Sequence, residues 1–260
     1  MQQAWRHLQA LTAAVEDHRP LTAAADWVPV SRTGNPAVSA WLTAVVFLLR
    51  AAGGMVPAVR VRQWALAALL APWRDPESLR AGRVPSGDAK PWPDCTATLV
   101  QRLLALDTVP APTLATLRHH HDPWPGPDGV APYLGAQWLG AVEWLTHQVF
   151  RTDGQAWSPA RAWAALRDQA GVRWEAAVVE HLAGAVSPYA PGEVVRLTTG
   201  EAAVVQAVPG GHPERPWVRL LTGPAQGTVV GLADPAGAGR QIAGLWPHRE
   251  WDAPPAPAAG

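Results

Sequence analysis

The first 186 residues show apolar stretches with helical periodicity, separated by short polar or proline-rich breaks. Apolar residues recur every three to four positions, which is the spacing of a helix with one buried face. Asn35 and Ser158 each precede a proline, and a capping side chain followed by proline is typical of a helix start. We therefore predict helices near residues 5–15, 36–52, 57–71, 94–106, 113–121 and 133–150, from residue 158 onward, and at 174–186, with a loop at 74–93.

The pattern changes at Ser187-Pro188, where short runs rich in β-branched residues replace the helical periodicity. Residues 193–197 and 203–208 flank Thr199-Gly200, which is a β-hairpin pattern. Two further short strands are expected at 217–221 and 228–230. We predict a small antiparallel β module over residues 187–248, with five strands or fewer, and a disordered Pro/Ala-rich tail at 249–260.

Composition narrows the classes of function. The chain has 260 residues, 48% of them hydrophobic, and its 21 basic residues balance its 21 acidic residues. This balance argues against a nucleic-acid or acidic-membrane partner. The single cysteine, Cys95, rules out an intramolecular disulfide. The longest apolar run, 41–49, is far shorter than the ~20 residues that span a bilayer. We expect a cytoplasmic protein without a membrane, DNA or RNA partner.

Candidate chemistry is concentrated at His119-His120-His121-Asp122, at the predicted end of a helix. Imidazoles beside a carboxylate suit a metal site, although consecutive helical residues point about 100° apart, so all three histidines cannot share one metal without an irregular turn. A structural alternative is that positive charge there favours the last carbonyls of the helix. Trp124 and Arg118 are candidates for a ligand pocket. Glu143 is an acid on an apolar helix, with His147 one turn further on.

Two segments resemble the HD-GYP family, bacterial relatives of the HD phosphohydrolases that typically hydrolyse cyclic di-GMP. Residues 117–126 resemble its HHE-x-x-DG-x-GYP segment, and residues 191–197 resemble its PxGxxVRL strand. The resemblance covers roughly residues 5–235. It implies a mainly α fold, with an HD-type helical bundle over residues 1–186 followed by the small C-terminal antiparallel β module.

The resemblance also implies which site residues are kept. The paired histidines fall on His120 and His121, Asp122 stands where the family has glutamate, and Glu143 stands near the family's aspartate. These four are the candidate metal ligands. Other expected ligand positions are replaced: the His-Asp pair by Ala71-Pro72, and two further histidines by Ser39 and Trp92.

A binuclear hydrolase needs several ligands for each of two metals. We therefore expect a degenerate, non-catalytic signalling protein that binds a partner protein or a nucleotide such as a cyclic dinucleotide, with no cofactor or with one Mn or Fe ion at a remnant site. One alternative is an active metal-dependent phosphodiesterase with a rearranged site that recruits Asp75 or Asp128. Another is a structural scaffold for dimerisation, and the sequence leaves a homodimer open.

Overall fold

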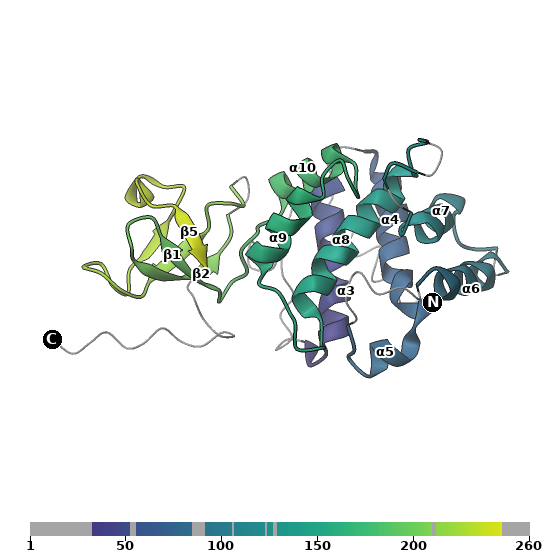
Figure 1. Cartoon of the computed structure of the whole chain (residues 1–260), viewed down its shortest axis with the longest axis horizontal. Coiled ribbons are helices and arrows are strands. Elements are labelled where there is room, and N and C mark those ends of the chain that lie inside the picture. The colour runs from purple at the N-terminus through teal and green to yellow at the C-terminus, as the bar shows by residue number, and fades with distance from the viewer. Residues whose placement is uncertain are drawn as a thin grey trace. The chain divides into compact units, whose positions relative to one another are not determined.

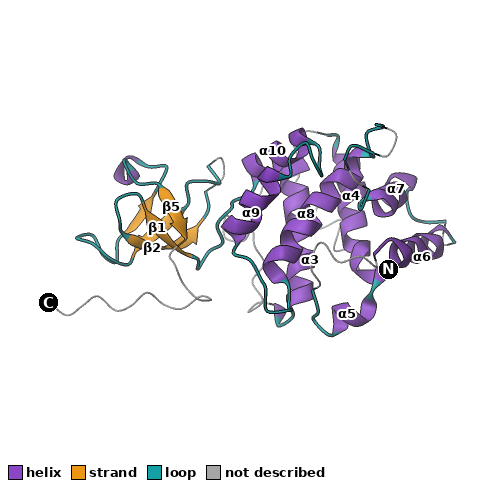
Figure 2. Cartoon of the chain, viewed as in Figure 1, coloured by secondary structure: helices purple, strands orange, loops and turns teal. Residues whose placement is uncertain are grey.

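A computed structural model describes residues 33–52, 56–84, 92–105, 107–122, 124–126, 129–209 and 212–245. The chain divides into a helical unit that ends at Val186 and a β unit that begins at Ser187 (Figures 1 and 2). The expected helix at 5–15 and the expected tail at 249–260 lie outside the described residues. The predicted mainly α class with a small C-terminal antiparallel sheet is confirmed.

Within the described residues the helical unit consists of helices α3 to α10 and one short 3-10 turn, η1. Long apolar α3 and α8 lie side by side, and α4, α7, α9 and α10 also pack against α8 (Figure 1). None of the described helices has the length and apolar character needed to cross a bilayer. The helix bounds are α3 Pro36–Ala52, α4 Ala58–Leu70, η1 Ala71–Arg74, α5 Pro76–Arg80, α6 Trp92–Leu104, α7 Ala111–His119, α8 Leu134–Phe150, α9 Pro159–Asp168 and α10 Ala176–Ala185.

Side-chain caps fix several of these starts, as predicted. Oδ1 of Asn35 accepts a hydrogen bond from the backbone N–H of Val38 at 3.1 Å, and Oγ of Ser158 accepts one from Arg161 at 3.3 Å. Each satisfies an N–H that has no partner inside the helix. The predicted loop at 74–93 is wrong in part, because residues 76–80 form α5 and α6 begins at Trp92, before Asp94.

The β unit is one antiparallel sheet with the strand order β4-β3-β2-β1-β5. The predicted hairpin is present, and Gly200 at its turn has a φ of 86°, a conformation that glycine adopts at little cost. The fifth strand, β5, was not predicted individually. The strand bounds are β1 Val194–Leu197, β2 Ala202–Ala207, β3 Trp217–Leu220, β4 Val229–Gly231 and β5 Ile242–Leu245.

The β unit has a hydrophobic core of its own. Alternate residues of β1 and β3 are buried, so one face of the sheet packs inward. The buried residues of this core are Val195, Leu197, Ala203, Val205, Val218, Leu220, Val230 and Leu232.

Candidate metal centre and adjoining cavity

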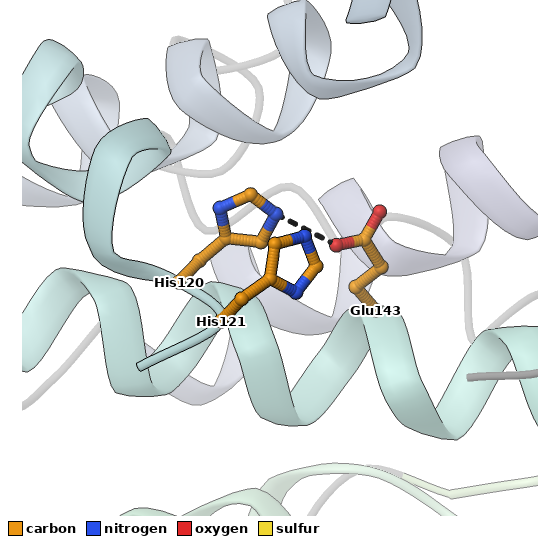
Figure 3. A group of neighbouring side chains, drawn as sticks. All are labelled: His120, His121 and Glu143. Atoms are coloured by element: carbon orange, nitrogen blue, oxygen red, sulfur yellow. Dashed lines mark ion pairs between the residues drawn. The ribbon is translucent and has the colours of Figure 1, made fainter. Parts of the chain in front are cut away.

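The histidines and the glutamate predicted from the sequence meet in the helical unit. His120 and His121 follow the last residue of α7, and Glu143 lies in the middle of α8. One ligand atom from each of these three residues lies within 4.8 Å of the other two, and Figure 3 shows both imidazoles turned toward the carboxylate. These three residues could therefore form a metal-binding cluster.

α7 ends at His119, and the rings of His120 and His121 lie close together in the turn that follows. The ring centroids of His120 and His121 lie 3.8 Å apart. Gly140 on α8 allows the close approach, because a Cβ at this position would lie 2.4 Å from the carbonyl oxygen of His120. The glycine therefore brings the end of α7 against the helix that carries Glu143.

Arg74 contacts two of these three residues, His120 and Glu143. Its side chain is 3% exposed and forms a two-pronged ion pair with Glu143, with Nη1 donating to Oε2 at 3.2 Å and Nη2 donating to Oε1. Nη1 also lies 3.0 Å from Nε2 of His120. Pro72 ends α4 and starts η1, because proline lacks the N–H that a continued helix would need, and η1 carries Arg74 to the cluster.

His120 is held at both ring nitrogens. Nδ1 lies 2.7 Å from the carbonyl oxygen of Leu117, which can only accept, so Nδ1 carries a proton. Nε2 lies 3.0 Å from both Arg74 Nη1 and Glu143 Oε2. A neutral ring accepts from Arg74 at this nitrogen, whereas a protonated ring donates to Glu143. In both states the lone pair of Nε2 is unavailable to a metal.

Burial and neighbouring charge shift the pKa values of the cluster. Burial would raise the pKa of Glu143, but Arg74, together with His120 and His147, holds it well below its usual range. Burial lowers the pKa of His147 to about 4, against the attraction of Glu143. His121 keeps one side exposed to solvent, while the loss of water on the other side and the neighbouring His120 lower its pKa to about 3.

A divalent metal does not fit the cluster while Arg74 is in place. Both oxygens of Glu143 are bonded to the guanidinium, and the lone pair of His120 is occupied. A metal about 2.1 Å from Nε2 of His120 would lie at most about 5 Å from Nη1 of Arg74. At that separation a dication and a guanidinium repel by roughly 7 kcal/mol at an effective dielectric constant of about 20. Both ring nitrogens of His120 have hydrogen-bond partners, whereas neither ring nitrogen of His121 has one among the described residues.

The cluster borders a cavity of about 120 Å³. One wall carries Arg173, whose guanidinium carbon lies 4.8 Å from the ring centroid of Trp174 and 5.9 Å from that of Trp144. Exposed His121 also lines this cavity. The remaining lining residues are Arg74, His120, Asp122, Gly140, Glu143 and His147.

The other predicted site residues lie around this cavity in different ways. Asp122 lines it, and its carboxylate lies 2.7 Å from Nδ1 of His119. Arg118 is exposed on α7 and Trp124 is half-buried in the following turn, and neither lines the cavity. His147 lies 3.7 Å from Glu143, an ion-pair distance that is too long for a hydrogen bond.

Asp75, the acid that a rearranged hydrolase would recruit, has another role. Its side chain caps α5 by accepting from the backbone N–H of Ser78 at 3.1 Å. It lines a second cavity of about 60 Å³, which shares Arg74, Glu143 and His147 with the first cavity but is not lined by His120 or His121. Asp128 lies outside the described residues.

Sequence reasoning missed the contribution of Arg74 to the cluster and of Arg173 and Trp174 to the cavity. Arg74 had a sequence signal, because it is a charged residue two positions after the proline that follows an apolar helix. Arg173 lies in the turn between α9 and α10, where no periodic pattern predicts which way a side chain points.

No family model matches the chain, and no curated protein sequence matches it.

Proposed function

We propose that this chain is a non-catalytic, HD-GYP-like protein that binds a phosphate-bearing ligand of the nucleotide class in the cavity beside Glu143. The observation that carries this proposal is Arg173. Trp144 and Trp174 hold its guanidinium at the cavity wall, and a positioned guanidinium suits the oxygens of a phosphate. His121 offers an exposed aromatic ring in the same cavity, against which a base can stack.

The charges of the cavity are compatible with an anionic ligand. Arg74 and Glu143 compensate each other, so this pair adds no net charge. Asp122 supplies one negative charge at the exposed edge, where His119 is hydrogen-bonded to it. Arg173 adds a positive charge to the cavity wall, and its guanidinium lies against the rings of Trp144 and Trp174.

Hydrolysis by a two-metal mechanism is not supported by this arrangement. Such a mechanism needs two ions about 3.5–4 Å apart, each with several ligands. Among the described residues one cluster of three ligands is present, and Arg74 already holds two of its members. The capping role of Asp75 removes one acid that an active, rearranged site would need.

A small-molecule ligand fits these observations better than a protein partner. The recognition groups line a concave cavity and not a flat face, as is typical of small-molecule sites. The signalling partner protein and the homodimer expected from the sequence stay predictions.

Calorimetric titration of the purified full chain with cyclic di-GMP, GMP and inorganic phosphate tests the proposal. We expect at least one nucleotide to bind, and Arg173→Ala to weaken binding about 10-fold or more, because a charge-assisted hydrogen bond contributes roughly 1.5–3 kcal/mol. Arg161→Ala is the matched control. Arg161 also lies over a tryptophan, 4.5 Å from the ring centroid of Trp157, but does not line the cavity. Equal losses in the two variants, or no binding by the wild type, would overturn the proposal.

Incubation of the same protein with cyclic di-GMP and Mn²⁺ tests the absence of catalysis. We expect no linear dinucleotide or GMP by chromatography, because the ligand set is held by Arg74. Turnover that is lost in His121→Ala would show that the chain is an active phosphodiesterase.

A further inference from the structure

Two residues of the candidate metal cluster, His120 and Glu143, contact a cation that belongs to the chain, Arg74. The guanidinium of Arg74 contacts both oxygens of Glu143 and Nε2 of His120, so it touches two of the three potential ligands at the atoms a metal would use. Its side chain is 3% exposed, and that of His120 is fully buried. The contact therefore lies in the interior of the helical unit, where water does not screen it, and not on the surface.

Arg74 supplies the counter-charge that a metal ion would otherwise give to Glu143. Buried Glu143 would be costly as an unpaired carboxylate, and one positive group in direct contact is enough to compensate it. Arg74 supplies that positive charge through two parallel N–H donors, the geometry in which arginine pairs best with a carboxylate.

We propose that Arg74 is the resident cation of a latent His-His-Glu metal site, and that the site takes one divalent transition metal ion when the guanidinium is removed. Shortening Arg74 frees both oxygens of Glu143 and the lone pair of His120, while His121 already has free nitrogens. Two imidazoles and one carboxylate form a ligand set that suits Zn²⁺ and Co²⁺. The proposal concerns the same cluster as the proposed function but does not depend on a nucleotide ligand.

Metal titration of the full-length wild type and Arg74→Ala tests this directly. Zn²⁺ binding is followed by calorimetry, and Co²⁺ binding by its visible absorption, which reports the coordination of the ion. We expect one ion per chain in Arg74→Ala, bound at least about 100-fold more tightly than by the wild type, because a like charge has left the site. Stoichiometric binding by the wild type that is lost in His121→Ala would overturn the proposal, as would a folded Arg74→Ala that takes no ion.

Two control variants separate the site from a general change of charge. Arg74→Ala/His121→Ala removes one of the three ligands and should lose the gained metal. Arg83→Ala removes one positive charge from an exposed residue that does not line the cluster cavity, and should gain no metal. A similar gain in Arg83→Ala would show that net charge, and not the cluster, determines metal binding.

Arg74→Ala leaves Glu143 without its counter-ion, so its folding is tested with and without Zn²⁺ present during refolding. Folding that depends on Zn²⁺ supports the proposal. If the variant folds in neither condition, Arg74→Ala/Glu143→Gln decides, because removing the uncompensated charge should restore the helical circular dichroism signal. A double variant that also fails to fold would overturn the role of Arg74 as the charge-balancing cation. Nucleotide binding by the wild type is unaffected by these outcomes, so this inference and the proposed function fail separately.

Discussion

Glu143 is in contact with more charged and titratable groups than any other acid of the cavity. Its carboxylate is paired with Arg74, lies 3.0 Å from His120 and 3.7 Å from His147, and is 13% exposed. Because Arg74 and His120 are themselves buried, little water can reach them to replace the carboxylate if it is removed. The energetic role of Glu143 is therefore to compensate Arg74 as much as to be compensated by it.

We predict that Glu143→Ala lowers the free energy of unfolding of the helical unit by about 3–5 kcal/mol, the range observed when one partner of a buried ion pair is removed. The loss arises because Arg74 stays buried without the carboxylate that it pairs with. Urea denaturation followed by far-ultraviolet circular dichroism measures it. Glu180→Ala, at an exposed acid on α10, is the control and should change stability by less than about 0.5 kcal/mol. Equal effects at the two positions would contradict the role of the pair.

A second buried acid, Glu193, lies at the start of the β unit. Its side chain is buried, Oε2 accepts from the backbone N–H of Ala190 at 3.1 Å, and Oε1 is buried without a hydrogen bond. Burial raises the pKa of Glu193 to about 8, and the hydrogen bond from Ala190 offsets this only in part. The folded β unit therefore holds a proton that the unfolded chain releases near the ordinary glutamate pKa of 4.5.

We predict that the β unit loses stability as the pH rises from about 4.5 to about 8. Below pH 4.5 Glu193 is protonated in both the folded and the unfolded state. Between pH 4.5 and pH 8 only the unfolded state loses the proton, and this loss lowers the free energy of the unfolded state. The loss levels off above pH 8 at about 5 kcal/mol, as an order of magnitude for a shift of this size. Glu193→Gln should abolish this dependence and be more stable than the wild type at pH 8, as measured by thermal denaturation across the pH range.

Glu214→Gln provides the control for this pH effect, because Glu214 is an exposed acid of the same unit. It should keep the wild-type pH dependence. A flat wild-type stability between pH 5 and pH 8 would show that Glu193 is not protonated in the folded state.

At the scale of elements, the sequence predicts what local chemistry determines. Asn35 and Ser158 cap α3 and α9 as expected, because a capping side chain acts on backbone groups two or three residues away. The hairpin at Thr199-Gly200 is predictable for the same reason. His120, His121 and Glu143 come together as the spacing and the resemblance indicated.

The position of Arg74 could not be predicted in this way. Its partners lie 46 and 69 residues further along the chain, so the contact depends on how η1, α7 and α8 pack and not on any local pattern. The position of Arg173 in the cavity wall also depends on packing between distant elements, because the turn between α9 and α10 brings Arg173 over Trp144 on α8. The sequence therefore identified ligand-type residues but not the cation that contacts two of them.

The contact between α7 and α8 gives a prediction at this scale. Gly140→Ala would place a Cβ 2.4 Å from the carbonyl oxygen of His120, so the end of α7 must move away from α8. We expect a loss of about 1–3 kcal/mol in the stability of the helical unit, as for other overpacked sites, and weaker nucleotide binding because His121 moves with the turn. Chemical denaturation and the nucleotide titration measure the two effects.

Gly184 is the matched control, a glycine on α10 whose added Cβ would meet no atom within 4 Å. Gly184→Ala should stabilise the helix by up to about 1 kcal/mol, because alanine has the higher helix propensity. A Gly140→Ala variant that gained stability in the same way would show that the two helices are not in close contact at this position.

At the scale of the whole molecule, the chain combines two units with separate hydrophobic cores. The helical unit is built around α3 and α8, and its fully buried side chains include Phe47, Leu117 and Trp138. The β unit buries a different set around Val205 and Val218 on β2 and β3. Each core can be weakened by a substitution that leaves the residues of the other core unchanged.

We therefore predict two transitions in scanning calorimetry, each belonging to one unit. Val218→Ala removes buried methyl groups from the β core and should lower only one transition, by several degrees, because losing buried carbon atoms from a small core costs on the order of 1–3 kcal/mol. Gly140→Ala should lower only the other. If both variants shift a single common transition, the two units unfold together, and the stability effects predicted for Glu143 and Glu193 would then have to appear in the same unfolding event.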